Sequence, residues 1–286
     1  MSRPGGFDPR LTPARPDLAA AHLKGRLEAA RFVEGTAKRV ITATAPLRRN
    51  PLHDAPLDTE GLHGERVMVY EMTDEGWAWG QLELDRYVGW LPAAALGDAG
   101  AKSTHRVTAL RTFLYSRPDI KSPPLDALSF GSRVVAARHE GAFAVTATGN
   151  FVTARHLAPA DTIEPDFVAT AQRFLGVPYL WGGRSSLGLD CSGLVQIALQ
   201  AAGHACPRDS DMQAEFGKPV SFSGDPATLY RGDLVCWKGH IGFVSEPGRL
   251  LHANAFHMQV AEEPLAEAIA RIRKDGLEVT MVRRIQ

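Results

Sequence analysis

The sequence has few cysteines and no excess of charge of either sign. Three of its 286 residues are cysteine, and 32 Lys and Arg residues balance 32 Asp and Glu residues. Three widely spaced cysteines form neither a disulfide framework nor a CxxC metal pair, so we expect reduced thiols. A formal net charge of zero gives no global field that would attract DNA, RNA or anionic lipid, and we expect no nucleic-acid partner.

Long hydrophobic runs are also absent. Arginine, acidic residues and proline interrupt residues 1–26 before a secretory h-region of about 7–15 apolar residues could form. No stretch approaches the roughly 18 apolar residues of a membrane span. We therefore expect a cytoplasmic protein without a membrane anchor. The hydrophobic content of 44% and charged content of 22% are ordinary for a folded chain, and the length suits two or three domains.

Residues 1–35 are expected to form a lead-in to the first domain. Pro-rich, turn-prone sequence comes first and is followed by LAAAHLKGRLEAARFVEG. The Ala, Leu and charged residues of this segment recur at helical spacing and predict one exposed helix.

Residues 36–160 have the pattern of small all-β modules, since short runs of Val, Thr and aromatic residues alternate with Gly, Asp and Pro turns. Segments 55–71 and 123–140 share Pro-Leu-Asp, then Gly-x-Arg-Val, then a strand pattern. This repeat predicts two copies of one fold, in residues 36–100 and 101–160. The layout resembles bacterial SH3-like barrels, above all in GW and YVGW of the first copy. The second copy lacks these tryptophans, and the aromatic residues could equally well fill a barrel core.

A third domain is expected in residues 161–286, where an amphipathic helix pattern precedes the Gly-rich segment VPYLWGGRSSLGLD. The next residues, CSGLVQIALQAAG, predict a largely buried helix that starts at Cys191 and closes at Gly203. Unpaired N–H groups and the helix dipole at this position favour the thiolate, which is the nucleophilic form. A buried cysteine that packs as a small hydrophobic residue is the alternative.

Two histidines follow on strands that are expected to be adjacent. His240 comes directly after a strand and a tight turn, and His252 lies in the next strand pattern. A cysteine nucleophile needs a base and a third polar group that orients the base, and Cys191, His240 and His252 could fill these roles. Other histidines, such as His22 and His257, are expected to be ordinary surface or core residues.

Six motifs occur in order in this third region: PYLWGG, DCSGL, PRDSDMQ, RGDLVCW, GHIGFV and LLHAN. From about residue 165 to 286 the sequence therefore resembles the NlpC/P60 cysteine peptidases, papain-like enzymes that cut peptidoglycan stem peptides. The resemblance implies an α+β architecture, in which a papain-like catalytic domain follows two small all-β SH3-like barrels. It implies that Cys191 is the nucleophile, His240 the general base, His252 the third polar residue and Tyr179 part of the oxyanion region.

The same resemblance places the substrate's N-terminal end at Asp190 and Ser192. Asp190 could pair with a free ammonium group, which would reject acetylated peptides. Arg208 is a candidate for a substrate carboxylate, with a surface salt bridge as the alternative. Relatives with two SH3-like domains imply that Tyr87, together with Asp85, closes the pocket around the amine, although Tyr87 in the barrel core is the simpler account.

The function implied is a γ-D-glutamyl-L-diamino-acid endopeptidase that acts on murein peptides with a free N-terminal L-Ala, in cell-wall peptide recycling. An amidase or acyltransferase of the same superfamily, or a non-catalytic peptidoglycan-binding module, remains an alternative. We expect no cofactor and no metal, because no cluster has zinc-ligand spacing. Cys206 and Cys236 match no family role. The expected partner is the murein peptide, and the sequence indicates no partner protein.

Overall fold

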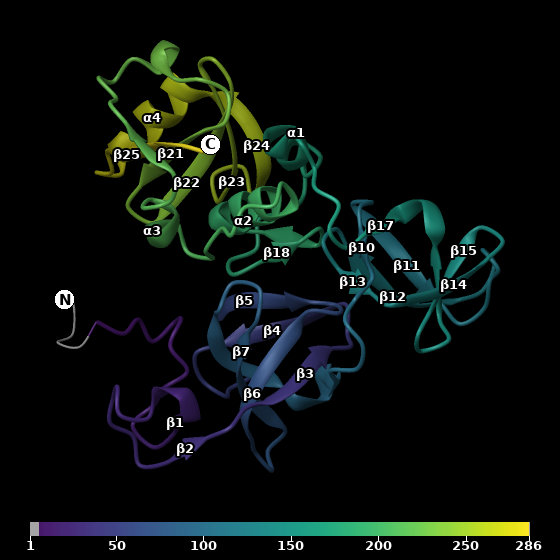
Figure 1. Cartoon of the computed structure of the whole chain (residues 1–286). Helices are drawn as coiled ribbons and strands as arrows, with labels where there is room; N and C mark the ends of the chain where they lie inside the picture. Colours follow the sequence, from purple (N-terminus) through teal and green to yellow (C-terminus); the bar gives the residue numbers. More distant parts are fainter. Residues whose placement is uncertain (1–5, 286) are drawn as a thin grey trace. The chain divides into compact units, whose positions relative to one another are not determined.

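The structure is a computed structural model that describes residues 6–285 (Figure 1). The chain divides into two compact units, Met1–Thr162 and Ile163–Gln286. The first unit consists of strands and short 3-10 turns, whereas the second combines helices with a sheet. Among the described residues, no helix is long and apolar enough to cross a membrane.

The helix predicted within residues 18–35 is wrong. The segment instead holds β1 (Ala19–Ala20), a 3-10 turn (Ala21–Leu23) and β2 (Phe32–Val33), and β1 pairs with β2 in parallel. Gly25 has a φ of +80°, a left-handed conformation that does not continue a helix. Leu18 is completely buried in an aromatic cluster of the first β module. Packing against this cluster therefore outweighs the helical propensity of the segment.

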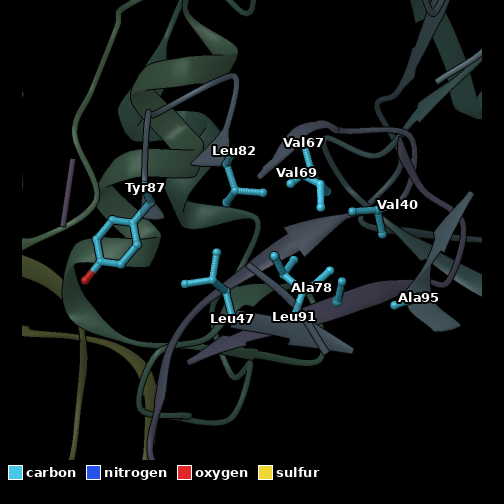
Figure 2. Close-up of a cluster of buried hydrophobic side chains, with 10 residues drawn as sticks. Val40, Leu47, Val67, Val69, Ala78, Leu82, Tyr87, Leu91 and Ala95 are labelled. Atoms are coloured by element: carbon cyan, nitrogen blue, oxygen red, sulfur yellow. The ribbon is translucent and has the colours of Figure 1, made fainter. Parts of the chain in front are cut away.

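The first β module is a seven-stranded antiparallel sheet with strand order β5-β4-β8-β7-β6-β3-β9. Its strands are β3 (Thr36–Val40), β4 (Thr44–Arg48), β5 (Leu57–Leu62), β6 (Arg66–Met72), β7 (Trp77–Leu82), β8 (Val88–Pro92) and β9 (Leu96–Asp98), with a 3-10 turn (Ala93–Ala95) before β9. Apolar side chains of one face meet in the cluster of Figure 2, which includes Val40, Leu47, Val67, Leu82, Tyr87 and Leu91.

The tryptophans of this module lie on its other face. Because side chains alternate along a strand, Ala78 joins the cluster of Figure 2 whereas Trp77 and Trp79 do not. They gather with Val88 and Trp90 around Leu18. The Arg15 guanidinium lies over the rings of Trp79 and Trp90, 4.4 and 4.8 Å from their centroids. The N-terminal segment thus covers the aromatic face of the sheet.

The second β module comprises a three-stranded sheet, β13-β10-β17, and a five-stranded sheet, β12-β11-β16-β15-β14. Its strands are β10 (His105–Val107), β11 (Arg111–Tyr115), β12 (Pro124–Ser129), β13 (Arg133–Val134), β14 (Ala136–Glu140), β15 (Phe143–Thr146), β16 (Phe151–Thr153) and β17 (Leu157–Pro159), with a 3-10 turn at Ala154–His156. The repeated segments fall on equivalent elements, since Pro-Leu-Asp lies at the start of β5 and β12, with Pro56 just before β5, and Gly-x-Arg-Val leads into β6 and β13.

The second unit is built on a six-stranded antiparallel sheet with order β20-β25-β21-β22-β23-β24 (Figure 1). Helix α2 packs against β22 and β23, and α4 packs against β23 and β24. The helices are α1 (Phe167–Gln172), α2 (Cys191–Ala201), α3 (Ser210–Gln213) and α4 (Leu265–Lys274), with a 3-10 turn at Pro226–Thr228. The strands are β18 (Arg184–Ser185), β19 (Gly188–Leu189), β20 (Lys218–Val220), β21 (Asp233–Trp237), β22 (His240–Glu246), β23 (Arg249–Asn254), β24 (Gln259–Pro264) and β25 (Val279–Arg284).

Candidate active site

Cys191 is the first residue of α2, as the sequence predicts. Asp190 caps the helix, because its Oδ1 accepts a hydrogen bond of 2.7 Å from the Gly193 N–H. A Cβ atom at Gly193 would lie 2.2 Å from the carbonyl oxygen of Gly183, so only glycine allows this turn to pack on the Gly-rich segment. The start of α2, and with it Cys191, is therefore fixed by its cap and by close backbone contact.

Burial of Cys191 favours its protonated thiol. Burial raises its pKa to about 12, and the neighbouring Asp190 carboxylate adds to the increase. The N–H groups of Ile241 and Ser192 favour the thiolate but do not outweigh burial. The expectation of a stabilised thiolate is therefore not met, and a nucleophilic role for this sulfur would require a base that removes the proton. Ile241 directly follows His240 on β22, so Cys191 interacts with the backbone of the residue next to the expected base.

His240 and His252 lie on neighbouring strands, and their rings are hydrogen bonded. His240 Nε2 and His252 Nδ1 are 2.8 Å apart. His252 is completely buried. A Cβ atom at Gly242 would approach the His252 Cβ to 2.9 Å, so the glycine in GHIGFV makes room for His252. The structure thus brings together the two histidines that the sequence singled out.

Both rings are neutral at neutral pH. Burial lowers the pKa of His240 to about 3, and the proximity of His252 and Arg271 adds to the decrease. Burial likewise lowers the pKa of His252, although its hydrogen bond to Glu263 opposes the shift. A neutral imidazole has one unprotonated ring nitrogen, so His240 can accept a proton.

Glu263 extends this pair of histidines, and the sequence analysis missed it. Its Oε1 lies 2.8 Å from His252 Nε2. Arg271 on α4 binds both carboxylate oxygens, with Nη1–Oε2 and Nη2–Oε1 distances of 2.6 and 2.5 Å. Burial opposes ionisation of Glu263, but the hydrogen bonds from Arg271 and His252 outweigh it and lower its pKa to about 2. We call His240, His252 and Glu263 the His-His-Glu chain.

The register of β23 and β24 distinguishes Glu263 from its neighbour Glu262. His252 pairs with Ala261 on β24, and side chains two residues apart on a strand share a face. Glu263 therefore lies on the His252 side, whereas its neighbour Glu262 points to the other side and binds Arg249 at 2.7 Å. The pairing of β23 with β24 is needed to choose between the two glutamates.

Asp190, Ser192 and Arg208 form one buried network. Arg208 Nη2 and Nη1 lie 2.7 and 2.9 Å from the two carboxylate oxygens of Asp190, and Nη1 is 2.8 Å from the Ser192 hydroxyl oxygen. The Gly182 N–H donates to Asp190 Oδ2 at 2.9 Å. Only 1% of the Arg208 surface is exposed, so the alternative of a surface salt bridge is wrong. This burial also disfavours direct contact between Arg208 and a substrate carboxylate, which stays a prediction.

Tyr179 lies in the segment that precedes the cap of α2. Its N–H donates to the Met258 carbonyl oxygen at 2.9 Å, and it bridges to Leu189. Partial burial, together with the nearby Cys191 and Asp190, raises the pKa of Tyr179. Its hydroxyl therefore remains protonated and can donate a hydrogen bond.

Tyr87 and Asp85 belong to the first unit. Tyr87 is 3% exposed and packs in the cluster of Figure 2, as the simpler account of this residue expects. Its N–H donates to Asp85 Oδ1 at 3.0 Å. A role for these two residues at the active site stays a prediction.

One group of described residues has metal-ligand types within reach of one another: the nitrogen and oxygen atoms of His252, His257 and Glu263 lie within 4.8 Å. Both ring nitrogens of His252 are already hydrogen bonded, and Arg271 binds both oxygens of Glu263. Hydrogen bonds and an ion pair thus account for this group, and we assign no metal to it. The absence of a cofactor stays a prediction.

Two family models match parts of this chain. Residues 176–275 match the NlpC/P60 family, and residues 47–96 match the bacterial dipeptidyl-peptidase SH3 domain. The chain is 30% identical over 242 residues to a γ-D-glutamyl-L-lysine dipeptidyl-peptidase of Bacillus subtilis, which covers 76% of this chain and 78% of the relative. A relative of the same name from Bacillus cereus is 27% identical over 245 residues, covering 73% and 71%. The crystal structure of an NlpC/P60 family protein from Bacillus cereus superposes with a TM-score of 0.71 at 21% identity, covering 87% of this chain and 99% of that one.

These matches define a peptidase with an N-terminal SH3-like domain. The chain belongs to the NlpC/P60 family.

Proposed function

We propose that the protein is a thiol endopeptidase that hydrolyses the bond between γ-D-Glu and the L-diamino acid of murein stem peptides. The observation that carries this proposal is the position of Cys191 at the start of α2, beside the strand that holds His240 and its hydrogen bond to His252. The relatives named γ-D-glutamyl-L-lysine dipeptidyl-peptidase support the class of bond.

The mechanism follows from the protonation states. Neutral His240 takes the proton of the Cys191 thiol, and the sulfur attacks the scissile carbonyl carbon. The Cys191 N–H and the Tyr179 hydroxyl donate to the oxyanion that forms. The His240 imidazolium then protonates the leaving amine, and water hydrolyses the thioester through the same base. His252 orients His240 throughout these steps.

Substrate selection rests on Asp190 and Ser192. An ion pair with Arg208 fixes the position of Asp190. The Asp190 carboxylate pairs with the free ammonium group of the N-terminal L-Ala. An acetylated amine is uncharged, so it cannot form this ion pair with the buried Asp190 carboxylate. A requirement for a free amine favours released peptides over intact wall, and the proposed role is the recycling of such murein peptides in the cytoplasm.

Mass-spectrometric turnover of L-Ala-γ-D-Glu-meso-diaminopimelate tests the proposal. The expected products are L-Ala-D-Glu and diaminopimelate, and the N-acetylated peptide should stay intact. The corresponding L-Lys peptide, run in parallel, decides which diamino acid is preferred; we expect diaminopimelate.

Other outcomes point to other functions. Cleavage of both the free and the acetylated peptide would mean an open cleft that acts on intact wall. Cleavage of neither would favour an amidase or acyltransferase of the same superfamily. Binding to sacculi without turnover would indicate a non-catalytic module. Fractionation of cells with an antibody to the native protein tests the location.

A further inference from the structure

The ionisation of Glu263 determines which atoms donate and which accept in the hydrogen bonds of the His-His-Glu chain. An ionised carboxylate only accepts hydrogen bonds, so the 2.8 Å contact with His252 requires a proton on His252 Nε2. A neutral His252 then has an unprotonated Nδ1, which accepts from Nε2–H of His240 across 2.8 Å. The proton of His240 therefore lies on Nε2, and Nδ1 is its basic nitrogen. The Glu263 carboxylate thus sets the tautomer of His252, and His252 in turn sets the tautomer of His240.

Arg271 keeps that acceptor ionised and in place. It binds both oxygens of Glu263 side by side, which fixes the orientation of the carboxylate. The guanidinium in turn lies 4.1 Å from the centroid of the Phe256 ring. Glu263 is only 7% exposed, so water does not compete for its oxygens.

We propose that Glu263, held by Arg271, is a positioning residue that fixes His240 in its Nε2–H tautomer and so leaves Nδ1 to take the proton of Cys191. This role rests on the proposed thiol chemistry, but not on the identity of the peptide. Glu263 touches neither the substrate nor the sulfur and acts through His252.

Glu263→Gln should reverse the donor and acceptor roles in the hydrogen bonds of the His-His-Glu chain. An amide has one acceptor oxygen, and the Arg271 cation competes for it. The amide nitrogen then faces His252 Nε2 and donates to it, so the proton of His252 moves to Nδ1. His252 Nδ1 now donates to His240 Nε2, and His240 carries its proton on Nδ1, where it no longer acts as a base.

Nitrogen-15 NMR of histidine-labelled protein reads these tautomers directly. At pH 7.5 we expect the Nε2–H form for both His240 and His252 in the unaltered protein, with signals assigned through His240→Ala and His252→Ala. In Glu263→Gln both should change to the Nδ1–H form. A Nδ1–H or doubly protonated His240 in the unaltered protein would overturn the proposal, and this measurement decides even if the variant fails to fold.

The rate of Cys191 alkylation by iodoacetamide, followed by mass spectrometry, gives a second readout that needs no peptide. Glu263→Gln should slow it at least tenfold and lower kcat for the murein peptide by about 100-fold or more, with little change in KM. Glu262→Gln is the matched control, since it removes the same charge from the preceding residue of β24. The Glu262 carboxylate binds Arg249 instead of His252. Equal effects of the two substitutions would contradict the proposal.

The two hypotheses fail in distinguishable ways. If the murein peptide is not cleaved but the tautomers and the alkylation rates respond to Glu263→Gln alone, the assigned substrate is wrong and the positioning role stands. If the peptide is cleaved but Glu263→Gln leaves the tautomers and alkylation unchanged, the positioning role is wrong.

Discussion

Arg208 Nη2 and Asp190 Oδ2 lie 2.7 Å apart in an ion pair that is almost completely buried at the start of α2. Asp190 also caps the helix that carries Cys191. One carboxylate therefore joins the Gly-rich segment, the cap of α2 and the segment before α3. Cys191, the proposed nucleophile, and the residues proposed to bind the substrate amine share this support.

Removal of Arg208 should destabilise the protein strongly. Arg208→Ala leaves the Asp190 carboxylate buried without its cation, and we expect the free energy of unfolding to fall by about 3–5 kcal/mol in urea titrations. Arg231→Ala is the control, because its pair with Asp166 is solvent exposed and should be worth about 1 kcal/mol or less. Equal losses in the free energy of unfolding for both variants would show that the buried ion pair stabilises the protein no more than the exposed one.

Cys191→Ala should abolish hydrolysis of the murein peptide and leave the fold intact. Without the sulfur no thioester forms, whereas the small residue still suits the first turn of α2. Turnover is measured by mass spectrometry and folding by circular dichroism. Cys236→Ala is the matched control, since Cys236 is also a buried, free cysteine, on β21. It should retain turnover, and activity that survives in Cys191→Ala instead would remove Cys191 from its assigned role.

The buried histidines should make stability depend on pH. The folded pKa of His240 is about 3, below its usual value of 6.5, so between these values the unfolded chain binds a proton that the folded chain does not. The free energy of unfolding should therefore fall as the pH decreases from 6.5 toward 3. His240→Gln should remove at most about 2 kcal/mol of the loss between pH 6.5 and pH 5.

Urea titrations at pH 7.5 and pH 5 measure this dependence. His139→Gln on β14 serves as the control, because this residue is exposed and lies outside the site. An identical loss in the unaltered protein and in His240→Gln would mean that His240 is not the group that titrates.

The N-terminal segment should contribute to the stability of the first β module. Leu18→Ala removes a completely buried side chain from the tryptophan cluster, and we expect a loss of about 2–5 kcal/mol in the free energy of unfolding. Leu52→Ala, at a half-exposed position, should cost well under 1 kcal/mol. Tryptophan fluorescence follows both. A loss of less than about 1 kcal/mol for Leu18→Ala would mean that packing of the N-terminal segment on the tryptophan cluster does not stabilise the module.

Most local structure of the second unit could be predicted from the sequence alone, and so could its family. The start of α2 at Cys191 and the two strands that carry His240 and His252 depend on a cap, on turns and on apolar periodicity, which are local properties. Other features could not be predicted in this way, because burial and interaction partners come from residues far apart in the sequence. Burial set the protonation of Cys191, the pairing of β23 with β24 selected Glu263 over Glu262, and packing against tryptophans replaced the expected N-terminal helix.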